Sequence, residues 1–356
     1  MRQDDSFIGE EKGLSYDCRL DMEAVSGYTV KRFQDEDAGL WDRFLEQEAV
    51  NGTFLQSRRF LNYHPRGRFQ DASYLILDKK GHLAAVLPAA ARTEGSARKL
   101  LSHPGSTYGG LVIGRKYQAV HKIIEMLVAC EAQWHEDGFT EVEMKMTPRL
   151  LSQTGTAETL DYAAHYLGYE ARPELDTYID YGDYQDDVLK NLSQGKRTNV
   201  HNCLKAGLKA RPLETFEEVD VLHHILQVSL SKFHKQPVHT AEELWEFKTE
   251  RLKKECGFFG IFLEEKMLAG AMMFYFEKVK TAHTQYLCAL PEYAALSPMS
   301  FLYYSIIAEM KKQGYRAITF GVSTEDYGKI LNFGLTRNKE AYGGKHCLEI
   351  SYRKEV

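Results

Sequence analysis

Apolar and polar positions along the first half of the chain form a pattern that predicts several strands and one long helix. Residues 74–77 and 83–90 are apolar and flank a short polar turn, which is typical of a β-hairpin. Over 120–134 apolar side chains recur at spacings of three, four and seven, which predicts an amphipathic helix that ends at Gly138. The alternating segment 140–146 then predicts another strand.

The second half repeats this order of elements. Residues 258–263 and 268–276 flank a polar turn and predict a second hairpin, and residues 282–288 predict a third strand. A helix is then expected from Ser297, because a proline follows at the first helical position. The strand 316–320 comes directly after the glycine that ends this helix.

The two halves match as two copies of one unit. Tyr74 in the first hairpin corresponds to Phe259 in the second, and Val142 corresponds to Ile318, at offsets of 185 and 176 residues. Two such similar offsets indicate one ancestral unit that is used twice. The expected fold class is α/β (α+β), with two tandem modules that each have a mixed, mostly antiparallel sheet flanked by helices.

The composition fits two globular modules and excludes several other classes of protein. The 356 residues are 44% hydrophobic and 27% charged, with 27 Gly and 9 Pro, which excludes collagen-like and disordered chains. No apolar run approaches the roughly 18 residues of a membrane helix. No signal-peptide pattern begins the sequence, so we expect a cytoplasmic protein without a membrane span.

Cysteine and histidine positions predict neither a metal site nor a disulfide framework. The six cysteines are scattered, with no Cys-x-x-Cys pair and no histidine at ligand spacing. The neighbouring residues His223 and His224 would lie on a helix, where adjacent side chains point in different directions. We therefore expect reduced cysteines and no metal.

A basic segment stands between the two units. Residues 188–213 carry six Lys or Arg and no Asp or Glu, in a chain whose net charge is -5. Arg197, His201, Lys205 and Lys209 recur every four residues, so on one helix they would form a single basic stripe. Such a stripe fits a phosphate-bearing partner, since Arg can hold a phosphate with two hydrogen bonds. The alternative is a basic face that docks against an acidic surface of the other domain.

The passage from the strand 282–288 into the following helix is a candidate cofactor site. A helix N-terminus presents free backbone N–H groups and the positive end of the helix dipole, which suit a diphosphate. Ser297, Met299 and Ser300 are therefore expected to bind the cofactor. The preceding loop 289–296 has no glycine and lacks the cradle of strong phosphate motifs, and an ordinary strand-to-helix crossover would look the same.

The small-residue loop 102–110 is a candidate substrate-facing loop. Its glycines permit close backbone approach and its hydroxyls can bond a polar ligand. We expect His103 and Tyr108 to face the substrate. The alternative is a structural turn.

A fourth candidate segment, 320–328, follows the carboxyl end of a predicted strand. Ligands usually bind at that edge of an open α/β sheet. Glu325 or Tyr327 would face the reacting group there as a base or an acid. The alternative is that Ser323 caps a helix, with Asp326 at the capping-box position.

These segments together resemble the FemAB-like branch of the GNAT superfamily of acyl-CoA N-acyltransferases, with two GNAT-type modules in one chain. The resemblance extends from about Tyr28 to the C-terminus, without the usual pyrophosphate signature Q/R-x-x-G-x-G/A after Cys288. It rests on Gly52-Thr53-Phe54-Leu55-Gln56-Ser57, Phe60-Leu61-Asn62-Tyr63-His64, Ser102-His103-Pro104-Gly105, Tyr108-Gly109-Gly110, Leu192-Ser193, Lys196-Arg197, Phe320-Gly321-Val322-Ser323-Thr324, Gly334-Leu335 and Lys339-Glu340-Ala341-Tyr342-Gly343-Gly344.

The resemblance implies a domain organisation and a basic substrate site. It divides the chain into a flexible tail (1–26), a first GNAT-like module (27–182), a basic connecting helix (183–212) and a second GNAT-like module (213–356). It also implies that Arg197 holds substrate phosphates, with His201 and Lys205 beside it. By the same resemblance, the substrate-binding residues near this pocket are Gln56, Ser57 and Arg58.

The resemblance further implies transfer of an acyl or aminoacyl group to an amine. A neutral amine would attack a thioester or ester carbonyl, while a backbone N–H near Tyr286 holds the oxyanion and an acid protonates the leaving group. The candidate catalytic residues are Glu325, Tyr327 and Tyr286. Acyl-CoA is the expected co-substrate, and aminoacyl-tRNA is the alternative.

The expected function is that of a bacterial N-acyltransferase. It would acylate an amino sugar or a peptide-like precursor of the cell envelope, so its partner would be a phosphate-bearing small molecule or glycan precursor. One alternative is an aminoacyl-tRNA-dependent transferase of the peptidoglycan bridge, for which tRNA is a partner. Another is a catalytically silent module that binds a phosphorylated glycan carrier.

Overall fold

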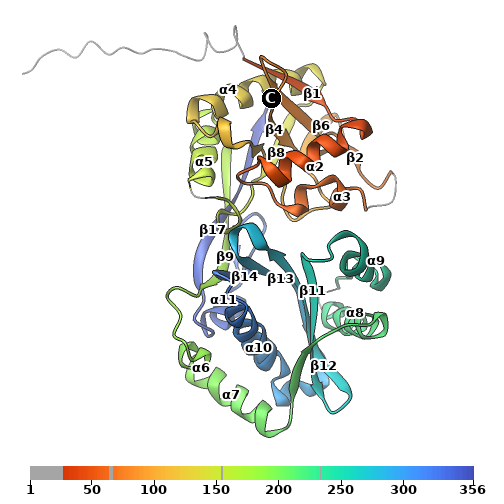
Figure 1. The fold of residues 1–356 in the computed structure, drawn as a ribbon, viewed down its shortest axis with the longest axis vertical. Helices are drawn as coiled ribbons and strands as arrows, with labels where there is room; N and C mark the ends of the chain where they lie inside the picture. The colour runs from red at the N-terminus through yellow and green to blue at the C-terminus, as the bar shows by residue number, and fades with distance from the viewer. Residues whose placement is uncertain (1–26, 64–66, 154, 233) are drawn as a thin grey trace, which may run out of the picture.

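The computed structural model describes residues 27–63, 67–153, 155–232 and 234–356, so the expected tail 1–26 lies outside the described residues. Figure 1 shows two halves stacked along the longest axis of the molecule. The first half contains β1 (Tyr28–Arg32), α2 (Ala38–Gln47), α3 (Arg58–Leu61), β2 (Gln70–Asp71), β3 (Tyr74–Asp78), β4 (Leu83–Leu87), β5 (Ala89–Glu94), β6 (Ala97–Ser102), β7 (Val112–Ile113), α4 (Val120–Glu136), β8 (Glu141–Lys145), α5 (Thr156–Tyr166) and β9 (Glu170–Asp180).

The second half begins with two helices and ends with a long strand. It contains α6 (Val188–Asn191), α7 (Gln194–Lys205), β10 (Lys209–Pro212), α8 (Phe216–Ser231), α9 (Ala241–Glu246), β11 (Cys256–Leu263), β12 (Lys266–Phe276), β13 (Thr281–Ala289), α10 (Pro298–Lys312), β14 (Ala317–Val322), β15 (Thr324–Glu325), β16 (Ile330–Leu331), α11 (Phe333–Glu340) and β17 (Lys345–Glu355). Short helical turns also occur at η2 (Phe54–Gln56), η4 (Arg149–Leu151), η6 (Glu277–Val279) and η7 (Pro291–Leu296). Both predicted hairpins and both predicted helices are present, and the predicted α/β fold class is confirmed.

One eleven-stranded sheet runs through both halves in the order β10-β11-β12-β13-β14-β9-β17-β8-β6-β5-β2. The last strand, β17, lies between β9 and β8 and is antiparallel to both. Its Cys347 pairs with Asp176 of β9, and its Ser351 pairs with Lys145 of β8. The sheet continues across the boundaries expected at 182 and 213. Strand β9 before them pairs with β14 after them, and β17 at the end of the chain pairs with β8 of the first half.

The hydrophobic cores also cross between the halves. Helix α4 packs Ile123 and Trp134 into the core of the first half, and α10 packs Ile306 into the core of the second. A third core joins Phe60 of the first half to Phe258 and others on the α8 side of the second half. A smaller sheet, β1-β3-β4-β7, completes the first half. This third core therefore contains apolar side chains of both halves.

The connecting segment differs from the predicted single helix. Helix α7 ends at Lys205, and Gly207 then adopts a positive φ of 82°. Lys209 and Arg211 lie on the edge strand β10, so the predicted stripe is wrong beyond Lys205. The physical reason is the glycine, which lets the chain reverse into the left-handed conformation that ends helices.

None of the helices in the described part of the chain has the length and apolar character needed to cross a bilayer.

Candidate functional site

The parallel strands β13 and β14 separate part of the way along their length. They pair over only three positions, from Thr281 opposite Ala317 to His283 opposite Thr319, although both strands continue. A register shift in β14 between Thr319 and Val322 accompanies the separation. We call this opening the splay. It leaves the facing strand edges outside the ladder, where their backbone groups can bond a ligand.

The first half contains the equivalent strand pair, but its opening is closed. Strands β6 and β8 also pair in parallel over three positions. The hydroxyl of Ser102 then accepts hydrogen bonds from the N–H groups of Lys145 (2.8 Å) and Gly110 (3.1 Å). The N–H of Gly109 donates to the carbonyl of Lys145 at 3.0 Å. The chain's own loop fills the position that the splay leaves open in the second half.

A row of polar side chains crosses one face of the central sheet. The row starts at Lys145 on β8, whose ammonium lies 3.7 Å from the carboxyl group of Glu349 on β17. Asp176 on β9 follows, and Thr319 on β14 donates to it at 2.6 Å. His283 on β13 is the strand partner of Thr319 and ends the row at the splay. Asp176 and Thr319 are 1% and 3% exposed, so the row is an internal feature.

Two carboxyl groups share the centre of this row. Burial and the neighbouring Asp176 carboxylate raise the pKa of Glu349 to about 8, so Glu349 is protonated at neutral pH. Burial also raises the pKa of Asp176, although Thr319 and Lys339 oppose the shift. The pair can therefore be buried with a single negative charge between them.

His283 and Lys339 bring nitrogen groups to the edge of the splay. Burial, together with the charges of Lys339 and Lys145, lowers the pKa of His283 to about 4, so its imidazole is neutral and can accept a proton. Lys339 on α11 donates to the carbonyls of Gly321 (2.6 Å) and Val322 (3.2 Å) at the end of β14. Burial lowers the pKa of Lys339 to about 8.

A chain of hydrogen bonds reaches β13 from the first half. The Tyr286 hydroxyl lies 2.8 Å from Nδ1 of His239, and Nε2 of His239 lies 2.8 Å from the Tyr63 hydroxyl. A neutral imidazole donates through one nitrogen and accepts through the other, so a proton can pass along this chain. Burial raises the pKa of Tyr286 to about 12 and also raises the pKa of Tyr63. Both hydroxyls are therefore protonated and available as donors.

The predicted cofactor-binding residues lie where α10 begins beside α7. Ser297 adopts a positive φ of 53°, and Pro298 opens the helix. Asn199 of α7 donates to the hydroxyl of Ser300 at 3.2 Å, and Met299 is partly buried next to it. Helix α7 therefore lies against the N-terminus of α10, which places its basic side chains near the positive end of that helix.

The predicted substrate-binding residues on α7 differ in their exposure and in their hydrogen bonds. Arg197 donates to the carbonyl of Leu192 at 2.6 Å, which holds one end of its guanidinium. His201 and Lys205 are exposed. Further along the basic segment, Arg211 forms an ion pair with Glu218 at 2.6 Å.

Gln56, Ser57 and Arg58 use their polar groups inside the first half. The Gln56 amide donates to the carbonyl of Gly109 at 2.6 Å, and Ser57 caps the N-terminus of α3. Arg58 is 1% exposed and forms an ion pair with Asp71. The Gln56 contact holds the loop that closes the first opening, whereas Ser57 and Arg58 contact α3 and Asp71.

A groove of about 330 Å³ lies beside this loop on the first half. Its lining includes Arg92, Lys99, Glu143, Lys145, Tyr108 and Tyr327, so it carries charges of both signs. The Tyr108 hydroxyl lies 2.9 Å from that of Thr53, and His103 is 4% exposed, with its Nδ1 accepting from Gly105. Because Lys145 also begins the polar row, the groove and the splay are connected through that row.

Glu325 and Tyr327 lie on a small hairpin formed by β15 and β16. The expected helix cap at Ser323 is wrong, since α11 begins only at Phe333 and Asn332 caps it. Ser323 instead accepts a hydrogen bond from Lys339 at 2.9 Å. Glu325 is exposed, whereas Tyr327 lines the groove. Neither belongs to the hydrogen-bonded chain that holds Tyr286.

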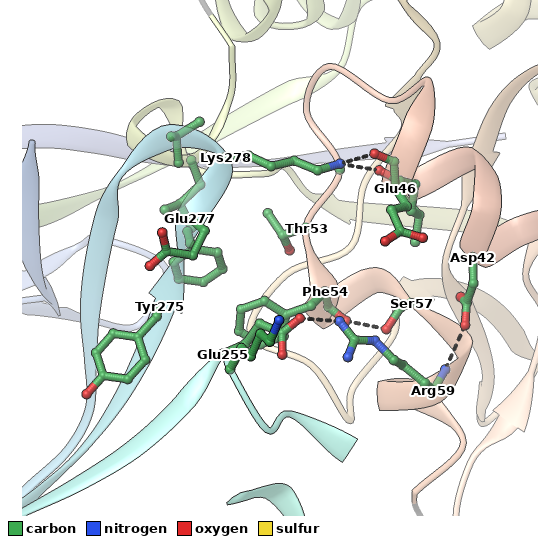
Figure 2. A pocket seen from close by; sticks show the side chains of 16 residues that line it. Asp42, Glu46, Thr53, Phe54, Ser57, Arg59, Glu255, Tyr275, Glu277 and Lys278 are labelled. Carbon is green, nitrogen blue, oxygen red and sulfur yellow. Dashed lines mark hydrogen bonds and ion pairs between the residues drawn. The ribbon is translucent and has the colours of Figure 1, made fainter. Parts of the chain in front are cut away.

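A separate pocket of about 530 Å³ lies between the halves, with an apolar floor that includes Phe54 and Phe276. Two polar contacts, which we call the clamps, join the halves beside this pocket. Figure 2 shows the first, an ion pair between Arg59 of the first half and Glu255 of the second. In the second clamp, the Lys278 ammonium donates to the backbone carbonyls of Leu45 (2.8 Å) and Glu46 (2.6 Å) in the first half. Ser57 lines this pocket.

Several residues of the site were not expected from the sequence. They are Tyr63, Lys145, Asp176, His239, His283, Lys339 and Glu349. Each is a single polar residue in an apolar or mixed segment, and only strand pairing or tertiary contact brings them together. His283 lies in a strand that also carries Thr284 and Gln285, so no local pattern distinguished it.

Comparisons with known proteins agree with this geometry. Residues 196–329 match the acetyltransferase (GNAT) domain, and no curated protein matches the sequence. The structure of FemX aligns with a TM-score of 0.64 at 10% identity, covering 92% of this chain and 97% of that chain.

Two further structures share the arrangement. L-PGS from Bacillus licheniformis aligns with a TM-score of 0.55 at 14% identity, covering 90% of this chain and 92% of that chain. A tandem GNAT protein from the clavulanic acid biosynthesis pathway aligns at 0.52 with 13% identity, covering 92% and 98%. At these identities the likeness is one of fold, and it extends over both halves.

Proposed function

We propose that this chain, whose residues 196–329 match the GNAT domain and whose fold resembles that of a tandem GNAT protein, transfers an acyl group to an amine at the splay of its second module. The observation that carries the proposal is the separation of β13 from β14 beside a neutral imidazole and a tyrosine hydroxyl. An acceptor of amino-sugar or peptide-like chemistry, as in cell-envelope precursors, fits the polar groove. Acyl-CoA is the proposed donor.

The donor is proposed to enter from the α10 side. The N-terminus of α10 presents the positive end of its helix dipole to phosphates, while the N–H groups of Ser300 and Phe301 bond the carbonyl of Ser297. Arg197 and Lys205 on the adjacent α7 add positive charge. This arrangement compensates for the absent glycine cradle, since charge and dipole act on phosphates without close backbone approach.

The acceptor is proposed to bind in the groove of the first module. The groove offers hydroxyl groups and charges of both signs, which suit a ligand that itself carries an amine and an acidic group. His103 and Tyr108 shape the loop above it from buried positions. Tyr327 reaches the groove from the second module, which links acceptor binding to the donor module.

The proposed reaction is a direct attack of the amine on the acyl carbonyl. The neutral imidazole of His283 takes the proton that the amine loses as its C–N bond forms. Unpaired N–H groups of the splay stabilise the oxyanion of the tetrahedral intermediate. When the C–S bond breaks, Tyr286 gives a proton to the thiolate, and Tyr286 and His283 then return to their starting protonation states by exchange with solvent, so that the net proton passes from the amine to the thiol.

The direct test is release of free thiol from acetyl-CoA in the presence of amine acceptors, together with thermal-shift measurements. A donor that binds only the folded protein must raise the melting temperature at saturating concentration. We expect acetyl-CoA to stabilise the protein and amino sugars or short peptides to stimulate thiol release. Stabilisation by a UDP-linked muropeptide with none by acetyl-CoA would refute acyl-CoA as donor.

A second candidate is transfer from aminoacyl-tRNA. It is favoured by the alignment with FemX over nearly the whole of both chains and by the positive charge of α7. Stabilisation by charged tRNA, with strong dependence on salt, would support it over the first proposal. Equal responses to charged and uncharged tRNA would count against it.

A further inference from the structure

We propose that Asp176 and Thr319 are positioning residues that hold the splay open from the strands shared by the two modules. The proposal rests on the proposed function, because it assigns both residues to the same donor site. Neither residue touches the reacting atoms. Both act on the backbone of β14 at the point where it leaves β13.

Thr319 occupies the last position at which β14 pairs with β13. Its hydroxyl contacts both carboxyl oxygens of Asp176, at 2.6 and 2.9 Å. The same oxygen accepts a hydrogen bond from the N–H of Gly321 at 3.1 Å. One hydroxyl therefore ties β14 to β9 and also fixes the residue two positions further along.

The backbone bends at Gly321, which has a positive φ of 71°. A β-carbon at this position would lie 3.4 Å from Cε1 of His283, so the bend packs directly beside the imidazole. The register shift between Thr319 and Val322 falls at the same place. Such bulges increase the local twist and redirect a strand. Strand β13 has a register shift of its own at Gln285 in its pairing with β12, so both strands change direction where the splay opens.

The surroundings of Asp176 explain why its charge can stay buried. Glu349 on β17 faces it in protonated form, and Lys339 on α11 supplies the opposite charge. Lys145 on β8 and Glu174 on β9 pair with each other at 3.0 Å on the far side of Glu349. Buried ionic groups contribute little net stability compared with apolar packing, so this cluster is better explained by the geometry it imposes.

A purely structural role predicts a different outcome from a positioning role. If the hydroxyl of Thr319 only filled the core, its removal would lower stability and leave the splay unchanged. Thr281 is the matched control, because it is fully buried at the other end of the same three-residue pairing. Its hydroxyl bonds the carbonyl of Leu150 at 3.2 Å, away from the splay.

The experiment compares Thr319→Val, Thr319→Ser and Thr281→Val in the full chain. Hydrogen–deuterium exchange at residues 320–323 reports the strand end without any ligand, and steady-state kinetics report the donor KM and kcat. We expect Thr319→Val to speed exchange and raise the KM for acetyl-CoA about tenfold, the equivalent of one lost hydrogen bond. Thr319→Ser should restore both, and Thr281→Val should leave both unchanged.

Two results would overturn the proposal. One is unchanged exchange at 320–323 in Thr319→Val, whatever the activity. The other is an equal rise in donor KM in Thr281→Val. A wild-type protein that neither binds nor turns over acetyl-CoA, while Thr319→Val still speeds exchange, would refute the proposed donor and support the positioning of β14.

Discussion

Buried ionisable side chains in the polar row are costly to fold, because each charged group loses its hydration there. Glu349 avoids the cost by keeping its proton, and His283 avoids it by staying neutral. The same burial fixes the protonation state of each group at neutral pH, while it makes the imidazole a weaker base and the carboxyl group a weaker acid. The chemistry of single residues in this protein therefore follows from their depth in the sheet.

Replacing Glu349 with Gln should weaken the dependence of stability on pH. The folded pKa of about 8 lies above the ordinary 4.5, so the folded state binds more protons between these values. The contribution of Glu349 is therefore fully present below about pH 4.5 and is lost as the pH rises through 8. Melting temperatures at pH 5, 6.5 and 8 should fall less in the variant, and an identical fall would contradict the prediction.

Removing the Tyr286 hydroxyl should slow the chemical step more than donor binding. We expect Tyr286→Phe to lower kcat by about 100-fold with little change in the donor KM, as for a general acid. Tyr63→Phe should have a smaller effect, because it acts through His239. Tyr352→Phe is the control, since that hydroxyl bonds Asp161 in the first half. Full activity of Tyr286→Phe would exclude it as the acid.

At the scale of elements, the proposed donor and acceptor sites lie on different halves of the molecule. The splay lies between two strands of the second half, while the groove lies on the first half beside a loop that closes the equivalent opening. Helix α7 brings basic residues to the start of α10 because a hydrogen bond from Asn199 to Ser300 joins the two. Donor and acceptor can therefore approach from different sides.

Because α7 ends at Lys205, two basic residues of the connecting segment lie on different elements and can serve as test and control. Arg197 lies on the helix, whereas Lys209 lies on the strand β10 beyond the glycine turn. We expect Arg197→Ala to reduce the melting-temperature rise caused by acetyl-CoA, and the effect should shrink at high salt. Lys209→Ala should behave like the wild type. Equal effects of both variants would show that net charge matters and the position of Arg197 does not.

At the scale of the whole molecule, the two modules share one sheet and one hydrophobic core. The strand β17 joins β9 to β8, and one hydrophobic core contains residues of both halves. Two clamps, Arg59 with Glu255 and Lys278 with the carbonyls of α2, hold the pocket between them (Figure 2). The site residues therefore depend on both halves, since Tyr63 reaches Tyr286 across this junction.

One donor should bind per chain, because only the second module has an open splay. Ser102 and Gly109 fill the equivalent opening of the first module with hydrogen bonds to Lys145. Titration calorimetry with acetyl-CoA should give a stoichiometry close to one. A stoichiometry of two would mean that the loop 102–110 opens and that the first module also binds donor.

The sequence alone was enough to predict the duplicated unit, both hairpins and the helices at 120–136 and 298–312. Local periodicity carries this information, since alternation and helical spacing depend only on neighbours in the chain. It was also enough to identify Tyr286 and the basic segment around Arg197 as candidates. It failed beyond Lys205 and at Ser323, where a glycine turn and a short hairpin replaced the expected helices.

Only the tertiary structure decided which polar residues meet. Asp176, Glu349 and Lys145 are far apart in sequence, and the return of β17 between β9 and β8 places them in one row. The reason is that strand order depends on long-range pairing, which no local pattern encodes. The sequence by itself determined two modules with a basic segment between them. Tertiary pairing decided that one module is open, that the other is closed, and that both supply the site.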